Sequence, residues 1–166
     1  AVTEIKASTF YGCLSLKDVA IPAGVTKISD SAFKNCTLLK NPIFPEALEV
    51  IDASAYDGCS SIDTINVPNS VLEIKKGAFR NCTSLKEITL PFIGVQRGGT
   101  DGTNQVFGHI FGFDSYSGQA SVPVRYREGG VYYYYIPQSL KKVTITDETI
   151  VPYGAFDGCS FIDEII

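Results

Sequence analysis

The stretch AFRNCTSLKEITLP at residues 78–91 decides the fold, because the chain repeats it in altered form. The copies read AFKNCTLLKNPIFP at 32–45, AYDGCSSIDTINVP at 55–68 and AFDGCSFIDEII at 155–166. Three residue types recur at steps of 23 positions: Phe10, Phe33, Tyr56 and Phe79; Cys13, Cys36, Cys59 and Cys82; Pro22, Pro45, Pro68 and Pro91. A constant period of this length indicates a repeat protein, in which no unit can bury its apolar residues without the next one.

Within each copy, two short groups of apolar residues predict two strands. The first has the spacing L-x-x-L-x-L, as in Leu85, Ile88 and Leu90, and its end alternates like a strand with one buried face. The second, such as Val71 and Ile74, predicts a shorter strand or turn on the opposite side of the coil. Because β-branched residues and the proline after each strand disfavour a helix, we expect a mainly β solenoid of stacked coils.

The repeat unit resembles that of the BspA-like leucine-rich repeat family, which reads approximately I-x-x-x-A-F-x-x-C-x-x-L-x-x-I-x-I-P. Five copies of the A-F-x-x-C phrase carry the resemblance, the first with Thr9 in place of Ala. The resemblance implies a leucine-rich-repeat solenoid, a right-handed coil of short parallel strands, which forms one domain over residues 1–166. One departure is Pro42, which stands where the strand expects an aliphatic residue.

Residues 92–137 interrupt the repeats, which occupy 1–91 and 138–166. Members of the family that the chain resembles often carry an interruption of this kind, between an IFG phrase and a Pro-x-Ser-Leu-Lys phrase. Within it, VFGHIFG is expected to keep one altered coil, with Phe107 or Phe111 in the phenylalanine position. The insertion is therefore either a shared architectural feature or a binding site.

The segment ASVPVRYREGGVYYYYIP at 120–137 predicts two strands around a turn at Glu128-Gly129-Gly130. Successive residues of a strand face opposite ways, so two of the four tyrosines would pack inward and two would face water. Exposed tyrosines can anchor a protein partner or stack on a sugar ring, whereas the alternative is that they cover the flank where the regular coil is missing. These binding candidates are Tyr132, Tyr133, Tyr134 and Tyr135.

A second set of binding candidates lies at the outward positions of the L-x-x-L-x-L strands. These positions differ from coil to coil while the inward positions repeat, which is the pattern that a recognition surface needs. Surface positions under no constraint would produce the same pattern. The polar members of the set are Asp18, Asn41, Thr64, Asn66, Glu87, Thr89, Lys142 and Thr144.

The cysteines and the single histidine do not predict a metal or catalytic site. Zinc ligands are paired about two to four residues apart, whereas these cysteines recur at the repeat period with no histidine nearby. Stacked side chains point in parallel, which opposes disulfide bonds, so we expect a column of buried, reduced thiols. His109 lacks a partner nucleophile, which favours a structural or surface role. We therefore expect no enzymatic activity, no metal and no cofactor.

The net charge of −4 argues against nucleic acid and against an anionic membrane surface as partners. No apolar run approaches the roughly 20 residues that a membrane-inserted helix needs. The resemblance implies a secreted or cell-surface protein of host-associated bacteria, and a non-enzymatic adhesion module that binds a host matrix protein, a microbial surface protein or a glycan. The alternatives are a passive spacer and a non-catalytic accessory region of a larger surface protein or enzyme.

The ends of the chain suggest that it is a piece of a longer protein. It contains no methionine, and it stops at FIDEII, inside a repeat. An open strand edge at that end would also allow the fragment to self-associate.

Overall fold

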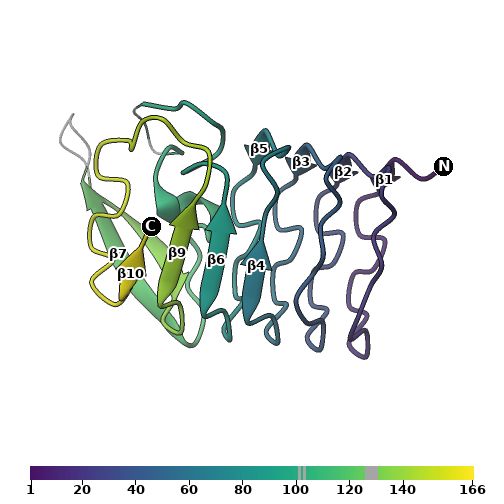
Figure 1. Cartoon of the computed structure of the whole chain (residues 1–166). Coiled ribbons are helices and arrows are strands. Elements are labelled where there is room, and N and C mark those ends of the chain that lie inside the picture. Colours follow the sequence, from purple (N-terminus) through teal and green to yellow (C-terminus); the bar gives the residue numbers. More distant parts are fainter. Residues whose placement is uncertain (101, 103, 126–130) are drawn as a thin grey trace.

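The chain forms a stack of coils in a computed structural model, which describes residues 1–100, 102, 104–125 and 131–166 (Figure 1). We name each coil by the aromatic residue that it places in the core. The first four coils and the last coil are marked by Phe10, Phe33, Tyr56, Phe79 and Phe156. An enlarged fifth coil, which contains Phe107, separates the fourth coil from the last.

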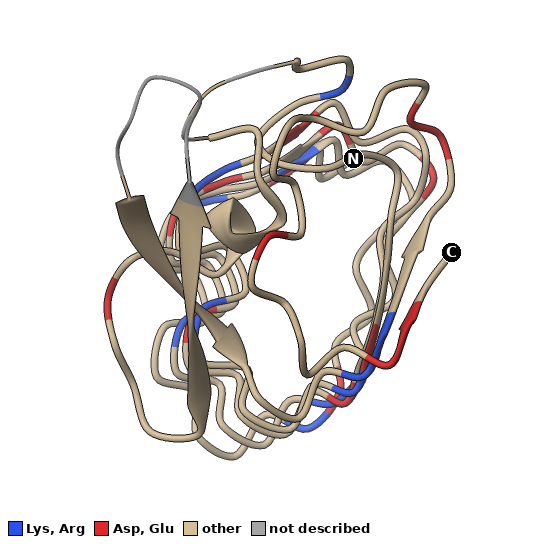
Figure 2. Ribbon diagram, turned by 90° about the vertical axis from the view of Figure 1, so that its left-hand side faces the viewer, with Lys and Arg blue, Asp and Glu red and all other residues tan. Residues whose placement is uncertain are grey.

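Two sheets of parallel strands run along the stack, on different sides of the coils (Figure 2). One sheet has the order β1-β2-β3-β5, from strands at Glu4–Ile5, Lys27–Ile28, Val50–Ile51 and Glu73–Ile74. The other has the order β10-β9-β6-β4, from strands at Glu164–Ile165, Lys142–Ile145, Glu87–Leu90 and Thr64–Asn66. Parallel pairing of neighbouring coils confirms the expected leucine-rich-repeat solenoid.

Each coil places the same kinds of side chain in the core, where they form columns along the stack. The rings of Phe10, Phe33 and Tyr56 follow one another at centroid distances of 5.0 Å, and Phe79 continues the column at 5.9 Å. Columns of alanine, leucine and isoleucine accompany the rings and are fully buried in the second to fourth coils. Each buried Å² of apolar surface contributes about 25 cal/mol, and most of it is buried between coils rather than within one.

The turn of the A-F-x-x-C phrase needs two left-handed backbone positions, which explains part of its sequence. One precedes the alanine position, at Ser8, Ser31, Ser54, Gly77 and Gly154; the other precedes the cysteine, at Gly12, Asn35, Gly58, Asn81 and Gly158. All ten residues have φ between 54° and 79°. Glycine and asparagine adopt this conformation most readily, so they alternate before the cysteine.

The cysteine thiols are free and form the expected column in the second to fourth coils. Each thiol donates a hydrogen bond to the carbonyl of the aromatic residue in the preceding coil. The sulfur–oxygen distances are 3.1 Å for Cys36–Phe10, 3.1 Å for Cys59–Phe33 and 3.4 Å for Cys82–Tyr56. Burial raises the pKa of these three thiols, which keeps them protonated and unreactive. Cys13 departs from the expectation because it is exposed.

Two of the expected L-x-x-L-x-L strands do not form, those of the first and second coils. Among the described residues, one isolated bridge between Ala20 and Ile43 joins these segments, and β4 of the third coil is the terminal strand of its sheet. The physical reason is Pro42, which has no N–H to donate to a ladder. Because Pro42 itself is buried, the core column continues where the ladder stops.

One of the two sheets continues past the insertion. Strand β6 pairs directly with β9, in register from Glu87–Lys142 to Leu90–Ile145. The other sheet ends at β5, where Glu73 makes an antiparallel bridge to Gln96 instead of pairing with a further parallel strand. The insertion therefore replaces one side of a coil and leaves the other side regular.

The 3-10 helix η1 (Phe107–Ile110) takes the place of the A-F turn in the fifth coil. The N–H of Phe79 donates to the carbonyl of Ile110, and the N–H of Phe107 donates to the carbonyl of Ala155. The nitrogen–oxygen distance is 3.0 Å in both hydrogen bonds. The Phe107 ring lies 5.1 Å from the Phe156 ring. Phe107 therefore continues the column toward the last coil, and Phe111 packs beside it at 5.4 Å.

Candidate binding surfaces

The four tyrosines lie on β8 (Val131–Pro137), which pairs with the antiparallel strand β7 (Gln119–Arg125). Figure 2 shows this hairpin along one flank of the stack. The two strands expected within residues 120–137 thus form, whereas the expected turn at Glu128-Gly129-Gly130 lies outside the described residues.

One face of the hairpin packs against the coils. Tyr134 is fully buried, and its ring lies 4.7 Å from the ring of Phe113. A Cβ added to Gly108 of η1 would come within 2.5 Å of the Tyr134 side chain, so the glycine permits the close approach of the hairpin. Val122, which lies opposite Tyr134 on β7, is buried as well. This half of the hairpin covers the flank, as one of the two interpretations of the tyrosines expects.

Of the other three tyrosines, one is half-buried with a hydrogen-bonded backbone and two are exposed to solvent. Tyr135 is half-buried, and its backbone is held on both sides. Its N–H donates to the Gly112 carbonyl, and its carbonyl accepts a 2.9 Å hydrogen bond from the Tyr116 hydroxyl. Tyr132 and Tyr133 are 50% and 53% exposed. Strand alternation alone does not give this division, because Tyr132 shares a face with the buried Tyr134 but lies nearer the end of the hairpin.

The outward polar candidates form two rows across the sheet that contains β4, β6 and β9. Strand pairing aligns them as Thr64–Glu87–Lys142 and Asn66–Thr89–Thr144. Lys142 is engaged within the row: its ammonium lies 2.9 Å from the Glu164 carboxylate of the last coil, and this pairing raises the pKa of Lys142. Asp18 and Asn41 are exposed in the first and second coils, before the regular strands begin.

The structure does not bring the two sets of candidates together. Figure 2 shows the hairpin on one flank and the column of β9 and β10 strands on the other, with the core between them. No single small ligand could contact both, so they are two separate surfaces.

Sequence reasoning missed a ladder of ion pairs along the stack. The Asp52 carboxylate lies 3.4 Å from the Lys27 ammonium and 3.1 Å from that of Lys75, and Asp57 lies between Lys34 and Arg80. Burial alone would raise the pKa of Asp52, but the hydrogen bond from the Ala53 N–H and the two lysines lower it below its ordinary value. The available signal was spacing, because Asp57 lies one period from both of its partners.

In the ranges that the structure describes, no group of three His, Cys, Asp or Glu side chains could hold a metal ion. His109 is buried in η1, its Nδ1 has no hydrogen-bond partner, and burial together with the charge of Lys76 lowers its pKa to about 4. It is a neutral part of the core, which fits the structural alternative of the structural or surface role expected from the sequence. No described helix is long and apolar enough to cross a bilayer.

The match to a family profile agrees with this architecture. The sequence profile of the BspA type leucine-rich repeat region matches residues 2–97 in six copies. A leucine-rich repeat protein of T. pallidum (TpLRR) is similar at 32% identity and a TM-score of 0.50, over 54% of this chain and 53% of its own. Another, from Bacteroides ovatus ATCC 8483, is similar at 20% identity and a TM-score of 0.40, over 99% of this chain and 52% of its own. No curated protein matches the chain.

The fold and its surfaces define a leucine-rich-repeat solenoid that carries a hairpin on one flank. Because the family profile covers more than half of the chain, the protein belongs to the BspA-type leucine-rich repeat family. The chain spans about half the length of the two solved structures described above. Proteins of this family are typically non-catalytic.

Proposed function

We propose that the chain is a non-enzymatic binding module of a secreted or cell-surface bacterial protein, which presents a rigid repeat scaffold to a protein or glycan. The observation that carries this proposal is the exposed pair Tyr132 and Tyr133, on a hairpin that the buried Tyr134 holds in place. A tyrosine on a rigid strand offers a large apolar face and a hydroxyl while losing little conformational entropy on binding.

Family membership supports the location and the absence of catalysis. BspA-type leucine-rich repeat proteins are generally bacterial surface or secreted proteins. A surface protein with an exposed aromatic pair fits adhesion to a host matrix protein or to the surface of another microbe, because aromatic residues are common anchors of interfaces. The tethering of β8 through Tyr134 and Tyr135 fixes the geometry of the pair before a partner arrives.

The proposal is tested by binding of the whole chain to immobilised extracellular-matrix proteins and neutral glycans, measured by biolayer interferometry. The test variant carries Tyr132→Ser and Tyr133→Ser. The matched control carries Tyr11→Ser and Tyr153→Ser, which remove two tyrosines that are equally exposed, at 53% and 54%, but lie outside the hairpin. Circular dichroism of all three proteins checks that the fold is unchanged.

We expect one or more partners to bind the unmodified chain and the control, and to lose about tenfold or more in affinity for the test variant. Equal binding by both variants would move recognition to the repeat face, where the two polar rows lie. If no matrix protein or glycan binds the unmodified chain, the passive spacer becomes the better account.

A further inference from the structure

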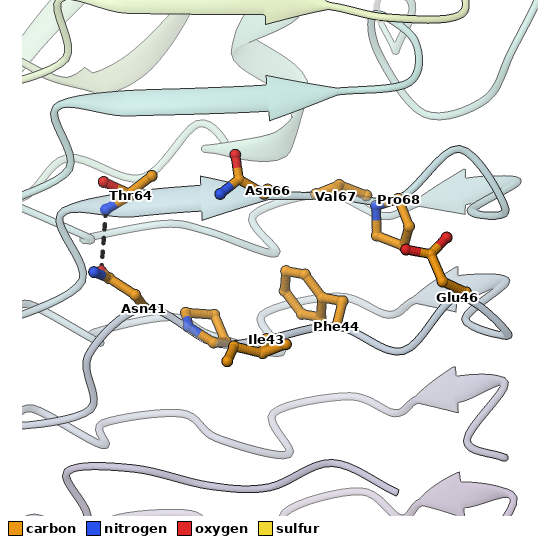
Figure 3. A pocket seen from close by; sticks show the side chains of 9 residues that line it. Asn41, Ile43, Phe44, Glu46, Thr64, Asn66, Val67 and Pro68 are labelled. Atoms are coloured by element: carbon orange, nitrogen blue, oxygen red, sulfur yellow. Dashed lines mark hydrogen bonds between the residues drawn. The ribbon is translucent and has the colours of Figure 1, made fainter. Parts of the chain in front are cut away.

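A pocket of about 290 Å³ opens on the outer face of the solenoid, between the second and third coils (Figure 3). It is distant from the hairpin, and three of the outward binding candidates line it: Asn41, Thr64 and Asn66. The pocket lies beside β4, where the hydrogen-bond ladder of the β10-β9-β6-β4 sheet ends. It therefore results from a single residue that departs from the repeat.

Pro42 is that departure. It occupies the position that Ile65 and Ile88 hold in the next two coils, but it cannot donate the hydrogen bond that joins adjacent strands. The side chain of Asn41 makes up part of the loss, because its Oδ1 accepts hydrogen bonds from the N–H groups of Asp63 and Thr64, at 3.3 and 3.2 Å. Among the described residues, no other side chain substitutes in this way along the remainder of the strand edge.

The pairing of β4 with β6 shows which backbone groups are left over. The Asp63 carbonyl and the Val67 N–H both make hydrogen bonds toward β6. Because successive residues of a strand direct their backbone groups to opposite sides, the N–H and the carbonyl of Asn66 face the second coil. In the part of the chain that the structure describes, neither the Asn66 N–H nor the Phe44 N–H has a protein partner. Backbone groups of this kind are normally paired, so the pocket offers hydrogen-bond donors and acceptors to a ligand.

The lining limits the chemistry of that ligand. It contains two amides (Asn41 and Asn66), one hydroxyl (Thr64) and one carboxylate (Glu46), and no cationic side chain. An anion would therefore find no counter-charge, whereas hydroxyl groups, which both donate and accept, suit a mixture of amide, hydroxyl and carboxylate partners.

The remainder of the lining is apolar. Ile43 is 82% exposed in a row of otherwise small or polar residues, and Pro42 and Pro68 also line the pocket. Phe44 forms the floor, held edge-on against the Tyr56 ring at 5.7 Å. Such a wall suits the C–H face of a sugar ring whose hydroxyl groups reach the polar side. Small-ligand pockets usually combine an apolar lining with a few polar groups that orient the ligand.

We propose that this pocket binds a neutral sugar residue. A peptide strand is a poorer fit, because the segment from Asn41 to Phe44 runs beside β4 and occupies the place that an added strand would take (Figure 3). The pocket accommodates one ring, with its C–H face on Ile43 and its hydroxyl groups toward Asn66 and Thr64. This site is independent of recognition by the hairpin, and either can exist without the other.

The test is amide chemical-shift perturbation of the isotope-labelled chain, titrated separately with glucose, galactose, N-acetylglucosamine and a blocked trialanine peptide. We expect at least one sugar to shift the Asn66, Thr64 and Phe44 amides saturably in the millimolar range, as one small pocket allows. Pro42→Ile should restore the ladder, keep or raise the melting temperature, and weaken this binding by about tenfold or more. Ser84→Ala, an exposed position of the fourth coil outside the pocket, should leave it unchanged.

Asn66→Ala provides a second variant that leaves the backbone intact, should Pro42→Ile alter the fold, and it should also weaken binding. The proposal is overturned if none of the three sugars gives saturable shifts at these amides, if only the peptide does, or if Asn66→Ala and a folded Pro42→Ile both bind as well as the original chain. Shifts confined to the hairpin amides would likewise overturn it, while supporting recognition by the tyrosines.

Discussion

In the first three coils the aromatic rings follow one another at 5.0 Å, with interplanar angles of 11° and 13°. In the fifth coil Phe107 reaches the same column from a 3-10 helix, and its ring meets Phe156 at 5.1 Å and 37°. In the regular coils the rings of Tyr56 and Phe79 are already 5.9 Å apart, at 25°. The contact of Phe107 with Phe156 therefore lies within the range of distances of the regular coils but has a larger interplanar angle.

The two regions also differ in how each position is supported. The rings of Phe33 and Tyr56 each have an equivalent ring on both sides, and their turns have the same hydrogen bonds as those of the neighbouring coils. In the insertion, the hairpin depends on contacts that occur once, such as Gly108 with Tyr134 and Tyr135 with Gly112. We expect damage in the repeats to propagate along the stack and damage in the insertion to remain local.

The largest effect is expected from Phe33→Ala in the regular stack. Phe33 is fully buried between the rings of Phe10 and Tyr56, so its loss leaves a cavity that the neighbouring coils can fill only by moving. Truncation of such a residue costs about 3–5 kcal/mol, which urea denaturation should show as a lower midpoint. Phe113→Ala, which removes a ring of the insertion that is 36% exposed, is the control and should cost far less. Equal losses would contradict the contrast between the two regions.

The regular part of the fold could be predicted because its period repeats each constraint several times. Phe33, Cys36 and Ile51 take the same positions in successive coils, so one reading of the pattern applies to all of them. The absence of the L-x-x-L-x-L strands in the first two coils could not be foreseen in full, although Pro42 was visible as a departure. Its effect on β4, and the pocket that results, depend on which backbone groups face which neighbour.

The sequence predicted which residues form the candidate surfaces, but not how these residues are arranged in three dimensions. Alternation predicts that two tyrosines of β8 face the core and two face solvent, whereas Tyr134 alone is fully buried and Tyr132, on the same face, is exposed. No local pattern specifies that a 3-10 helix replaces the A-F turn. The ion pairs of Asp57 required knowledge of which side of the coil each charged residue occupies.

A smaller effect is expected from pH, and it belongs to the insertion. His109 is 8% exposed and its pKa in the folded chain is about 4, below its ordinary value of 6.5, because burial and the nearby Lys76 disfavour the charged form. The unfolded chain therefore binds more protons between these pH values, and stability falls as the pH drops from 6.5 to 4. The loss reaches about 3 kcal/mol at most, since each unit of pKa difference corresponds to about 1.4 kcal/mol.

Urea denaturation at several pH values measures this effect, with His109→Gln as the comparison. The variant should lose most of the decline between pH 6.5 and 4, because glutamine does not titrate. Carboxylates such as Asp52, whose pKa in the folded chain lies below 3.8, act at lower pH and remain in both proteins. Identical pH profiles would show that His109 is not the group responsible.

The smallest effect is expected from Gly108→Ala, and it tests whether the insertion is held by contacts that occur only once. The added Cβ would lie 2.5 Å from both Cβ and Cγ of Tyr134, and because the Tyr134 Cβ cannot move without the strand, the hairpin has to shift. Overpacking of this kind costs about 1–3 kcal/mol. Gly24→Ala is the matched control, because its Cβ would meet only the Val2 carbonyl oxygen, at 3.6 Å. If damage to the insertion is local, hydrogen exchange should quicken at the Tyr135 amide, which donates to Gly112, and stay unchanged at the Phe33 amide, which donates to Ala55. Faster exchange at both would mean that the hairpin and the repeats unfold as one unit.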